Sequence, residues 1–579
     1  MPSTGDRLSR RRFVASGAAL AAGAAAWETT LRARASGAAR APGAPAGFPR
    51  GVAVSRERFQ NWSQAIEVEG VWTCAPRTPD EVVAVVNWAW RHRYRVRALG
   101  RAHTWSPLAL ARTPSRSPRV LLVDMTRHLT RMRMAGAGLA AVVTQTGATM
   151  EEMLAFLEAE GLGLTAYPAP GDLTVGGVLA IDGHGTAIPA PGEHRARGQS
   201  FGSVSNQVLS LTAVVWSERH RRYVLRTFDR DDSACASLLA HLGRAFITSV
   251  TLRAGPLRHL RCVSYTDVPA DELFAAPGAQ GRTFASFLES SGRVEAIWYP
   301  FTDAPWLKVW TVGRRRPATS RAVDAPYNYP FSDTLTDAEQ REIRGLVLSD
   351  PSEAVALGGE SYADTVAGLR AENSGDIWGA SKDVLLYVRP ATLRVTANGY
   401  AILTRRRDVQ RVISEFVARY REVVARYGAR GLYPLNMPVE IRVSGLDHPR
   451  DVGVDDAVPA LLSALSPRSD HPNWDVAVWL DILSFPGTPA ANRAYREIER
   501  WVFVNYRPPY ATVRPEWSKG WAYTDRGAWT NHRMITCTLP QAFSVARPPD
   551  RTWDAAVRTL HRLDPHAVFT SPLLRLLLR

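Results

Sequence analysis

The sequence predicts a two-domain α+β protein in which an α/β domain precedes a domain built on a large antiparallel sheet. Two observations predict this fold class. Strand-like and helix-like segments alternate from residue 71 to residue 186, which is typical of an α/β layer. Residues 256–504 hold long strand-like segments, and we expect two helices among them. A chain of 579 residues, 45% of them hydrophobic, is long enough to bury two or three cores.

The chain begins with a segment that has the features of a twin-arginine export signal. It reads Ser9-Arg-Arg-Arg-Phe-Val14, followed by an Ala/Gly-rich run to Ala26 and a small-residue cleavage candidate at Ala33-Arg-Ala35. The run is too short and too weakly apolar for a spanning helix, which needs ~20 strongly apolar residues. We therefore expect a signal at 1–35, a linker at 36–49 and a secreted or extracytoplasmic protein.

The charge and the cysteines of the sequence bear on two possible partners, nucleic acid and a metal ion. Lys and Arg number 71 against 55 Asp and Glu, which gives a formal charge of +16. The short clusters at 314–316 and 405–407 form no basic stripe with interleaved aromatics, so we expect no nucleic-acid partner. The four cysteines contain no C-x-x-C pair, and we expect no metal site. Whether they form a disulfide stays open.

The first domain's elements follow in order. Thr78 is a helix N-cap followed by acids in the first turn, and valines and tryptophans recur at helical spacing to about Arg91. A strand then leads toward His103. Further strands are expected at 120–124, 140–146 and 209–216, a helix at 150–160, and an apolar stretch at 243–252.

Residues 95–107 contain the first candidate binding segment. A short alternating strand runs into the loop 100–104, and a strand-to-loop corner containing glycine exposes successive backbone N–H groups. Such a nest binds phosphate, so we interpret this loop as a pyrophosphate cradle. His103 lies in the loop, where a neutral imidazole nitrogen is a nucleophile that can attach to a cofactor held there. The alternative is a turn histidine without a special role.

A second glycine-rich segment runs from Tyr167 to Thr186 and contains Gly171, Gly176, Gly177, Gly183 and Gly185. This density indicates backbone lying against a ligand. Neither segment contains the G-x-G-x-x-G dinucleotide fingerprint or a P-loop with its lysine. Those two nucleotide-binding folds therefore lose support.

Together the two segments resemble the flavin-binding domain of the vanillyl-alcohol-oxidase family. The resemblance implies FAD as the cofactor and His103 as the residue covalently linked to it. Some members add a second link through a cysteine upstream of the Gly-Gly pair, but Pro170 stands at that place, so we expect a single covalent link. The resemblance assigns the other cofactor-binding positions to Gly100, Arg101, Ala102, Thr104, Trp105, Gly176, Gly177, Asp182, Gly183, Gly185, Gly202, Ser203, Ile247 and Val250.

Over almost the whole chain after the signal, the sequence is similar to the covalently flavinylated class of bacterial cholesterol oxidases. The similarity rests on residues 59–62, 295–301, 326–329, 376–383, 438–442, 473–479 and 514–521. It implies a two-domain flavoprotein oxidase with an FAD-binding domain at 50–255, a sterol-binding domain at 256–504, and a segment at 505–579 that returns to the first domain. Thr104 departs from the pattern, in which glycine often follows the linked histidine, and the region 314–325 is short.

Oxidation of a secondary alcohol needs a base for the hydroxyl proton. Strand alternation places Glu440 and Arg442 on one face of residues 439–443. The residues alone fit a solvated edge pair as well as an active site. The resemblance places both at the active site, associates them with gating of oxygen access, and matches Glu295 to a further active-site carboxylate.

A Δ5 sterol requires one more step, in which a carboxylate in a dry pocket moves a proton from C4 to C6. Glu440 and Glu295 are the candidates, and the sequence does not divide the roles between them. Five aromatic residues either line the sterol cavity or belong to the ordinary core: Trp298, Tyr299, Trp306, Trp310 and Trp378.

The resemblance implies FAD-dependent oxidation of the 3β-hydroxyl of cholesterol-like sterols by O2, giving the 3-ketosteroid and H2O2, with Δ5 to Δ4 isomerisation. One alternative is an FAD-dependent oxidase or dehydrogenase of another bulky alcohol. Another is a secreted sterol-binding protein without flavin chemistry. The expected partners are the sterol, O2 and, transiently, a membrane surface, and the oligomeric state stays open.

Overall fold

The computed structural model describes residues 43–111, 119–136, 138–193, 199–332 and 336–579. The chain divides into a unit at 1–46 and a body at 47–579. The expected export signal and the first half of the expected linker lie outside the described residues. None of the described helices combines the length and the apolar composition needed to cross a bilayer.

The first sheet of the body has four strands and one covering helix. Its order is β1-β2-β4-β3, with bounds Ala53–Gln60, Glu67–Ala75, Val120–Asp124 and Arg95–Leu99. β2, β4 and β3 run parallel, while β1 pairs antiparallel with β2. Helix α2 (Pro79–Arg91) begins as predicted, because the Thr78 side chain accepts the backbone N–H of Glu81. This β-α-β unit ends in the loop that carries His103.

The second sheet has five antiparallel strands. Its order is β5-β6-β10-β8-β9, with bounds Met132–Met134, Ala141–Gln145, Phe246–Arg253, Val208–Ser217 and Arg222–Asp229. The shorter elements are α3 (Met150–Ala159), β7 (Leu162–Gly163), α4 (Val175–Ala180), η2 (Val204–Gln207), η3 (Cys235–Ser237) and β11 (Gly255–Pro256). Helix α3 starts in a capping box in which Thr149 and Glu152 satisfy each other's backbone N–H groups. The strands and the helix predicted for this region are confirmed.

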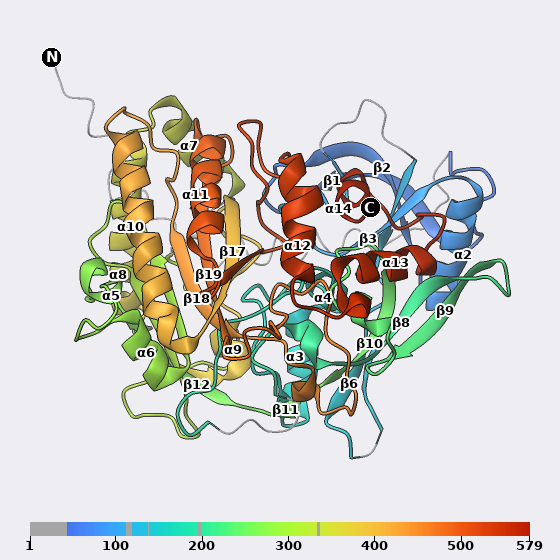
Figure 1. Cartoon of the computed structure of the whole chain (residues 1–579), viewed down its shortest axis with the longest axis horizontal. Helices are drawn as coiled ribbons and strands as arrows, with labels where there is room; N and C mark the ends of the chain where they lie inside the picture. Colours follow the sequence, from blue (N-terminus) through green and yellow to red (C-terminus); the bar gives the residue numbers. More distant parts are fainter. Residues whose placement is uncertain (1–42, 112–118, 137, 194–198, 333–335) are drawn as a thin grey trace. The chain divides into compact units, whose positions relative to one another are not determined.

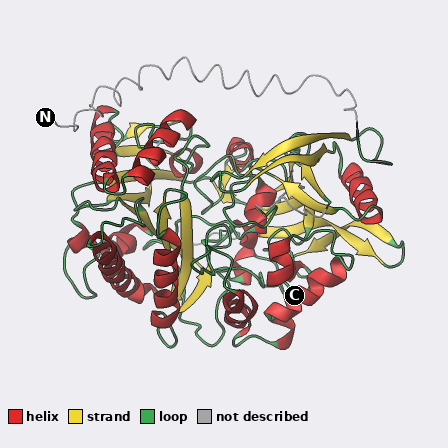
Figure 2. Cartoon of the chain, turned by 90° about the horizontal axis from the view of Figure 1, so that it is seen from above, coloured by secondary structure: helices red, strands yellow, loops and turns green. Residues whose placement is uncertain are grey.

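The third sheet has nine strands and forms the centre of the second domain (Figure 1). Its order is β15-β16-β12-β14-β13-β18-β19-β17-β20, with bounds Arg321–Ala322, Asp376–Ala380, His259–Tyr265, Trp306–Val312, Arg293–Trp298, Val439–Gly445, Val476–Ser484, Thr396–Thr404 and Thr512–Pro515. Every pair is antiparallel except β15 with β16. The large antiparallel sheet is therefore confirmed. Viewed from above, its strands and those of the smaller sheets form two groups joined by loops (Figure 2).

Helices pack around this sheet. They are α5 (Ala270–Leu273), α6 (Phe284–Ser291), α7 (Asp337–Ser349), α8 (Glu353–Ala371), α9 (Ser381–Leu385), η4 (Arg406–Asp408), α10 (Val409–Gly428), η5 (Pro449–Val452) and α11 (Ala491–Asn505). We expected two helices between residues 256 and 504, and that expectation was wrong. Helix α8 contains Gly358, Gly359 and Gly368 and buries few side chains, so its apolar periodicity is weak. Gly358 is needed where the helix meets Pro300, because a Cβ there would lie 2.5 Å from the Pro300 carbonyl oxygen.

All four cysteines are free thiols, so the disulfide that the sequence left open is absent. Cys74, Cys235 and Cys262 are buried, and Cys537 is exposed. Within the described ranges, no group of three or more His, Cys, Asp or Glu side chains is arranged to hold a metal ion.

The C-terminal segment packs against the first sheet. Its elements after β20 are η6 (Met534–Thr538), α12 (Leu539–Ser544), η7 (Pro549–Arg551), α13 (Trp553–Leu563) and α14 (Pro572–Leu577). The backbone N–H of Val96 in β3 donates to the Val568 carbonyl over 2.9 Å. The buried Arg97 guanidinium donates to the carbonyls of Phe569, Gly243 and Leu108. The last residues of the chain thus complete a core that begins near residue 50.

Asp564 anchors this return. Its carboxylate accepts hydrogen bonds from the Arg244 guanidinium and the Tyr223 hydroxyl. It also accepts the backbone N–H groups of Val568 and Phe569, both over 2.9 Å. The Arg244 and Asp564 side chains are only 3% and 2% exposed, so the ion pair is shielded from water and from salt.

We expect Asp564→Ala to lower the thermal unfolding midpoint strongly. The substitution leaves Arg244 buried without its carboxylate, and breaking a buried pair from one side commonly costs ~3–5 kcal/mol. Asp550→Ala, on the exposed part of the same segment, is the matched control. Equal midpoints for the two variants in a circular-dichroism melt would show that Asp564 does not anchor the segment.

Candidate active site

One cavity of about 390 Å³ lies between the first domain and the nine-stranded sheet. Its walls come from the loop after β3, from residues 166–186 and from the strands of the large sheet. The cavity brings together these sequence-predicted residues: Gly100, Arg101, Ala102, His103, Thr104, Trp105, Gly177, Asp182, Gly183, Gly185, Glu295, Glu440 and Arg442. Segments from both domains therefore meet at a single site.

The loop after β3 has the geometry of an anion nest. Ala102 has a φ of 52°, and no acceptor within the described structure bonds the backbone N–H groups of residues 101–104. Gly100 lies against the start of α4, where a Cβ would come within 2.3 Å of Thr174 Oγ1. Successive free amides supply the partial positive charge that a diphosphate requires. The geometry of the loop is thus compatible with the predicted pyrophosphate cradle.

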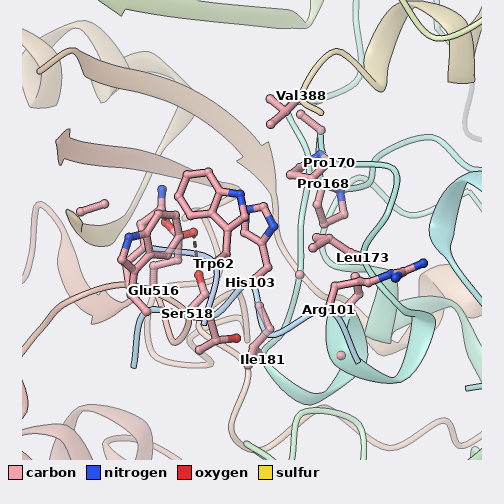
Figure 3. A pocket seen from close by; sticks show the side chains of 18 of the residues that line it. Trp62, Arg101, His103, Pro168, Pro170, Leu173, Ile181, Val388, Glu516 and Ser518 are labelled. Atoms are coloured by element: carbon pink, nitrogen blue, oxygen red, sulfur yellow. Dashed lines mark hydrogen bonds and ion pairs between the residues drawn. The ribbon is translucent and has the colours of Figure 1, made fainter. Parts of the chain in front are cut away.

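His103 projects from this loop under the indole of Trp62 (Figure 3). The two ring centroids are 4.5 Å apart and the planes are inclined by 13°. Burial, with a smaller contribution from the Arg394 cation, lowers the pKa of His103 to about 3. The imidazole is therefore neutral at neutral pH, and its buried Nδ1 has no hydrogen-bond partner in the described structure. A neutral, unpartnered imidazole nitrogen is a competent nucleophile.

Two distant segments hold the loop in position. The backbone N–H of Trp62 donates to the Ala102 carbonyl over 2.8 Å, and Asn61 Nδ2 donates to the Thr104 carbonyl over 3.1 Å. On the other side, the Trp105 N–H donates to the Ser518 carbonyl over 2.8 Å. Figure 3 shows Glu516 and Ser518 on one side of His103, with Pro168, Pro170 and Leu173 on the other.

The second glycine segment only partly follows its prediction. Gly177, Gly183 and Gly185 do line the cavity. However, a Cβ on Gly185 would come within 2.5 Å of the Tyr167 backbone, and one on Gly183 within 2.6 Å of Val178. These two glycines are therefore required by close approach within the protein. Nearby, Asp182 Oδ2 accepts the Ala464 N–H, and Asp182 Oδ1 is buried without a partner in the described chain.

The structure places some predicted cofactor positions outside the cavity lining: Gly176, Gly202, Ser203, Ile247 and Val250. Gly176 packs on Thr146, and Ile247 and Val250 are buried residues of β10. The Ser203 N–H and hydroxyl both donate to Asp447, over 2.7 and 2.8 Å. These residues support the walls of the cavity from behind.

The pairing register of β13, β18 and β19 brings the polar side chains of the site together on one face. Arg442 on β18 lies opposite Glu295 on β13, and Glu440 lies opposite Asp481 on β19. Directly opposed side chains of an antiparallel pair share a face. The alternating residues at 439, 441 and 443 are fully buried on the other face, so the predicted alternation is confirmed.

Arg442 is the centre of an ion cluster. Its guanidinium contacts Asp481, and lies 3.4 Å from Glu440 Oε2 and 3.6 Å from Glu295 Oε1. Lys519 also contacts Asp481, and its Nζ lies 3.1 Å from Glu516 Oε2. The cluster thus links three strands of the sheet to the C-terminal segment.

Burial and neighbouring charge set the protonation of the cluster. Although burial lowers the pKa of Arg442, its three carboxylates raise that pKa well above its ordinary value, so Arg442 stays cationic. Burial and the nearby Glu516 raise the pKa of Asp481 to about 7. Burial also raises the pKa of Glu516, but Lys519 and His184 outweigh it and hold that pKa well below its ordinary range. The carboxyl of Asp481, which titrates near neutrality, therefore lies beside the ionised carboxylate of Glu516.

Sequence reasoning missed several residues of this site: His184, Lys308, Tyr387, Asp481, Glu516 and Lys519. His184 stacks on Trp479 at 3.6 Å, and its Nε2 lies 3.8 Å from Glu516 Oε1. A signal for Asp481 did exist, because it is the one charged residue in the apolar strand Val476–Ser484. Glu516 and Lys519 lie in the similar segment 514–521, but nothing local shows what they contact.

Aromatic side chains form the apolar wall. Tyr299, Trp306 and Trp310 line the cavity. Trp298 instead packs against Phe274 and Tyr420, and Trp378 stacks on His259. The wall also holds the buried Lys308, whose Nζ lies 4.1, 4.6 and 3.5 Å from the ring centroids of Trp306, Tyr329 and Tyr387.

The fold and the site define a flavin-dependent oxidoreductase. The amide nest fits a diphosphate, His103 Nδ1 and Asp182 Oδ1 are buried without a partner in the described structure, and Gly100 keeps the cradle open. The ion cluster offers groups that exchange a proton with an alcohol. These features fit the FAD that the sequence implied.

Comparisons with known proteins agree with this class. A family model described as an FAD binding domain matches residues 72–219, and one described as cholesterol oxidase, substrate-binding, matches residues 259–579. A solved structure titled solvent-stable cholesterol oxidase is 54% identical, with a TM-score of 0.91 over 93% of this chain and 100% of that one. The cholesterol oxidase of B. sterolicum is 43% identical, with a TM-score of 0.89 over 93% and 99% of the two chains. No curated protein sequence matches.

The chain belongs to the cholesterol oxidase family. Its activity is the FAD-dependent oxidation of sterols, and its fold is the expected two-domain flavoprotein fold.

Proposed function

We propose that the chain oxidises the 3β-hydroxyl of cholesterol-like sterols with O2 as the electron acceptor, releasing the 3-ketosteroid and H2O2, and that it shifts the Δ5 double bond to Δ4. The observation that carries the proposal is the meeting of a neutral His103, an aromatic wall and the Arg442 ion cluster in one cavity. FAD, when bound, supplies the acceptor for the hydride and passes the electrons on.

The proposal includes a single covalent link between FAD and His103. It is supported by the neutral imidazole, by its orphaned Nδ1 and by the amide nest around it. Pro170 lines the cavity where a second link would require a cysteine, and no cysteine is among the described residues that line it.

Glu440 is the proposed base for the hydroxyl proton. It faces the cavity, and the permanently charged Arg442 lies 3.4 Å away to stabilise the carboxylate. Arg442 also contacts Glu295 and Asp481, so its guanidinium has alternative partners in different directions. This arrangement supports the proposed role of the Glu440–Arg442 pair in gating oxygen access.

The isomerisation needs a carboxylate that carries a proton from C4 to C6. Glu295 suits this step because its side chain is 1% exposed and accepts a hydrogen bond from the Tyr387 hydroxyl over 2.5 Å. Glu440, on the neighbouring strand, is the second candidate.

The alternative is an enzyme that keeps FAD but oxidises another bulky alcohol or uses another acceptor. Peroxide release by the purified holoenzyme, measured across sterols and non-steroidal bulky alcohols, separates the two. We expect one H2O2 per 3-ketosteroid formed and a Δ4 product from Δ5 sterols. Sterol oxidation without peroxide would sink the oxygen part of the proposal.

We expect His103→Ala to fold and to hold FAD without a covalent bond. Acid precipitation should then release the flavin into the supernatant, and the flavin potential and the oxidation rate should both fall. His128→Ala, on an exposed histidine of the same domain, should keep its flavin on the polypeptide. Flavin that stays with the His103→Ala polypeptide in acid would place the link elsewhere.

We expect Glu440→Gln to keep the shape of the site but to remove the base. Loss of a general base commonly costs ~10²–10⁴ in rate, so flavin reduction or isomerisation should slow far more than sterol binding weakens. Anaerobic stopped-flow mixing and product analysis measure these steps separately. Glu422→Gln, on the exposed surface of α10, is the control. Wild-type rates in Glu440→Gln would show that the Glu440–Arg442 contact is purely structural.

We propose export through the twin-arginine pathway, on the motif Ser9-Arg-Arg-Arg-Phe-Val14. Replacing Arg10 and Arg11 by lysine should leave active, flavin-loaded enzyme inside the cell. Arg32→Lys/Arg34→Lys makes the same chemical change outside the motif and should be secreted. Normal secretion of the Arg10→Lys/Arg11→Lys variant would overturn this localisation.

A further inference from the structure

A hollow of about 440 Å³ lies on the outer surface of α10 and α11, which pack side by side in Figure 1. We call it the arginine hollow. It is lined by Arg419, Arg493, Arg496, Glu497, Arg500, Trp501, Val504 and Asp525. None of these residues lines the active-site cavity.

The arginines of the hollow are only partly neutralised. Arg419 contacts Glu497 over 2.6 Å, and Arg496 contacts Asp525 over 3.0 Å. Arg493 and Arg500 are exposed, and within the described structure neither has a carboxylate at ion-pair distance. They lie two turns apart on α11 and face the same way. The hollow therefore presents two guanidinium groups that are free to bind an anion.

The positive surface continues along α10. Arg426 contacts Glu497, and the exposed Arg430 follows one turn later. Burial and the Glu497 carboxylate raise the pKa of Tyr427, and the nearby Arg493, Arg426 and Arg430 partly oppose that shift. Arginines from separate parts of the sequence thus gather into one surface, which the sequence alone did not reveal.

Apolar groups accompany these cations. Val504 is 61% exposed, and the half-buried Trp501 lies beside it in the hollow. Arginine next to exposed valine and tryptophan is typical of a surface that rests on the headgroup region of a bilayer.

The residues after α10 connect this surface to a loop beside the active-site cavity. Tyr433 follows α10 and packs edge-on against Phe301, with ring centroids 5.6 Å apart. Phe301 is 37% exposed, and Tyr299, two residues earlier, lines the cavity. An anionic surface held by the arginines would therefore also lie near this loop.

We propose that the arginine hollow binds the phosphoryl headgroups of an anionic phospholipid bilayer and so holds the enzyme on the surface from which it takes its sterol. This inference rests on the proposed function, since a sterol substrate resides in bilayers. Each cationic side chain near an anionic bilayer contributes about fivefold in partitioning. Salt screens such an attraction.

Co-sedimentation of the holoenzyme with vesicles tests the proposal. We expect binding to phosphatidylcholine vesicles that contain a fifth of phosphatidylglycerol, weak binding to phosphatidylcholine alone, and loss of binding in 0.5 M NaCl. Arg493→Gln/Arg500→Gln should weaken partitioning by roughly 25-fold, from two fivefold steps. Arg315→Gln/Arg316→Gln removes the same charge from an exposed loop and should change it far less.

Three results would overturn the proposal: equal binding to both vesicle types, equal losses in the two double variants, or binding to heparin without binding to anionic vesicles. The last result would assign the hollow to a soluble polyanion. Turnover of detergent-dispersed sterol by the wild-type enzyme separates failure of the docking surface from failure of the proposed function. If that turnover is normal and vesicle binding is absent, the docking surface fails while the proposed function stands, and if no sterol is oxidised in either form, the proposed function itself fails.

Discussion

A permanently charged guanidinium inside the protein is the constraint on which the second domain depends. Removing Arg442 from water is costly unless carboxylates surround it, and they come from its own strand and from both neighbours. A register slip of one residue would turn these side chains to the opposite face of the sheet, away from the cavity. Gly399 on β17 belongs to the same arrangement, because a Cβ there would lie 2.5 Å from Asp481 Oδ1. The register of four adjacent strands is therefore tied to one cation.

The two halves of the cavity differ in electrostatic character. The loop around His103 offers a neutral imidazole, backbone amides and the Arg101 cation, whereas the sheet offers carboxylates grouped around Arg442. This division suits a reaction in which a large anionic cofactor lies on one side and a proton moves on the other. Lys308 lies opposite Glu295 on the neighbouring strand, and its Nζ is close to three aromatic rings.

Features that depend on a few neighbouring residues could be predicted from the sequence. The Thr78 cap, the nest after β3 and the alternation at residues 439–443 each follow from a few neighbouring residues, and the structure contains all three. Contacts across the sheet could not be predicted, because nothing near Asp481 or Lys519 in sequence shows that they meet. The glycines of the segment from Tyr167 to Thr186 could not be interpreted from their local sequence for a related reason. Gly185 resembles a ligand-facing glycine, but its neighbour is the backbone of Tyr167. Helix α8 was missed because its three glycines weaken the apolar period.

The hydrogen bond from the Trp105 N–H to the Ser518 carbonyl has a consequence for how the protein is made. The loop that holds His103 is formed early in synthesis, but its partner emerges from the ribosome more than four hundred residues later. The anchor at Asp564 follows later still. The cradle can therefore reach its final form only after translation is almost finished. A nascent chain displays an open, apolar half-site for most of its synthesis, and that interval is when it most needs protection from aggregation.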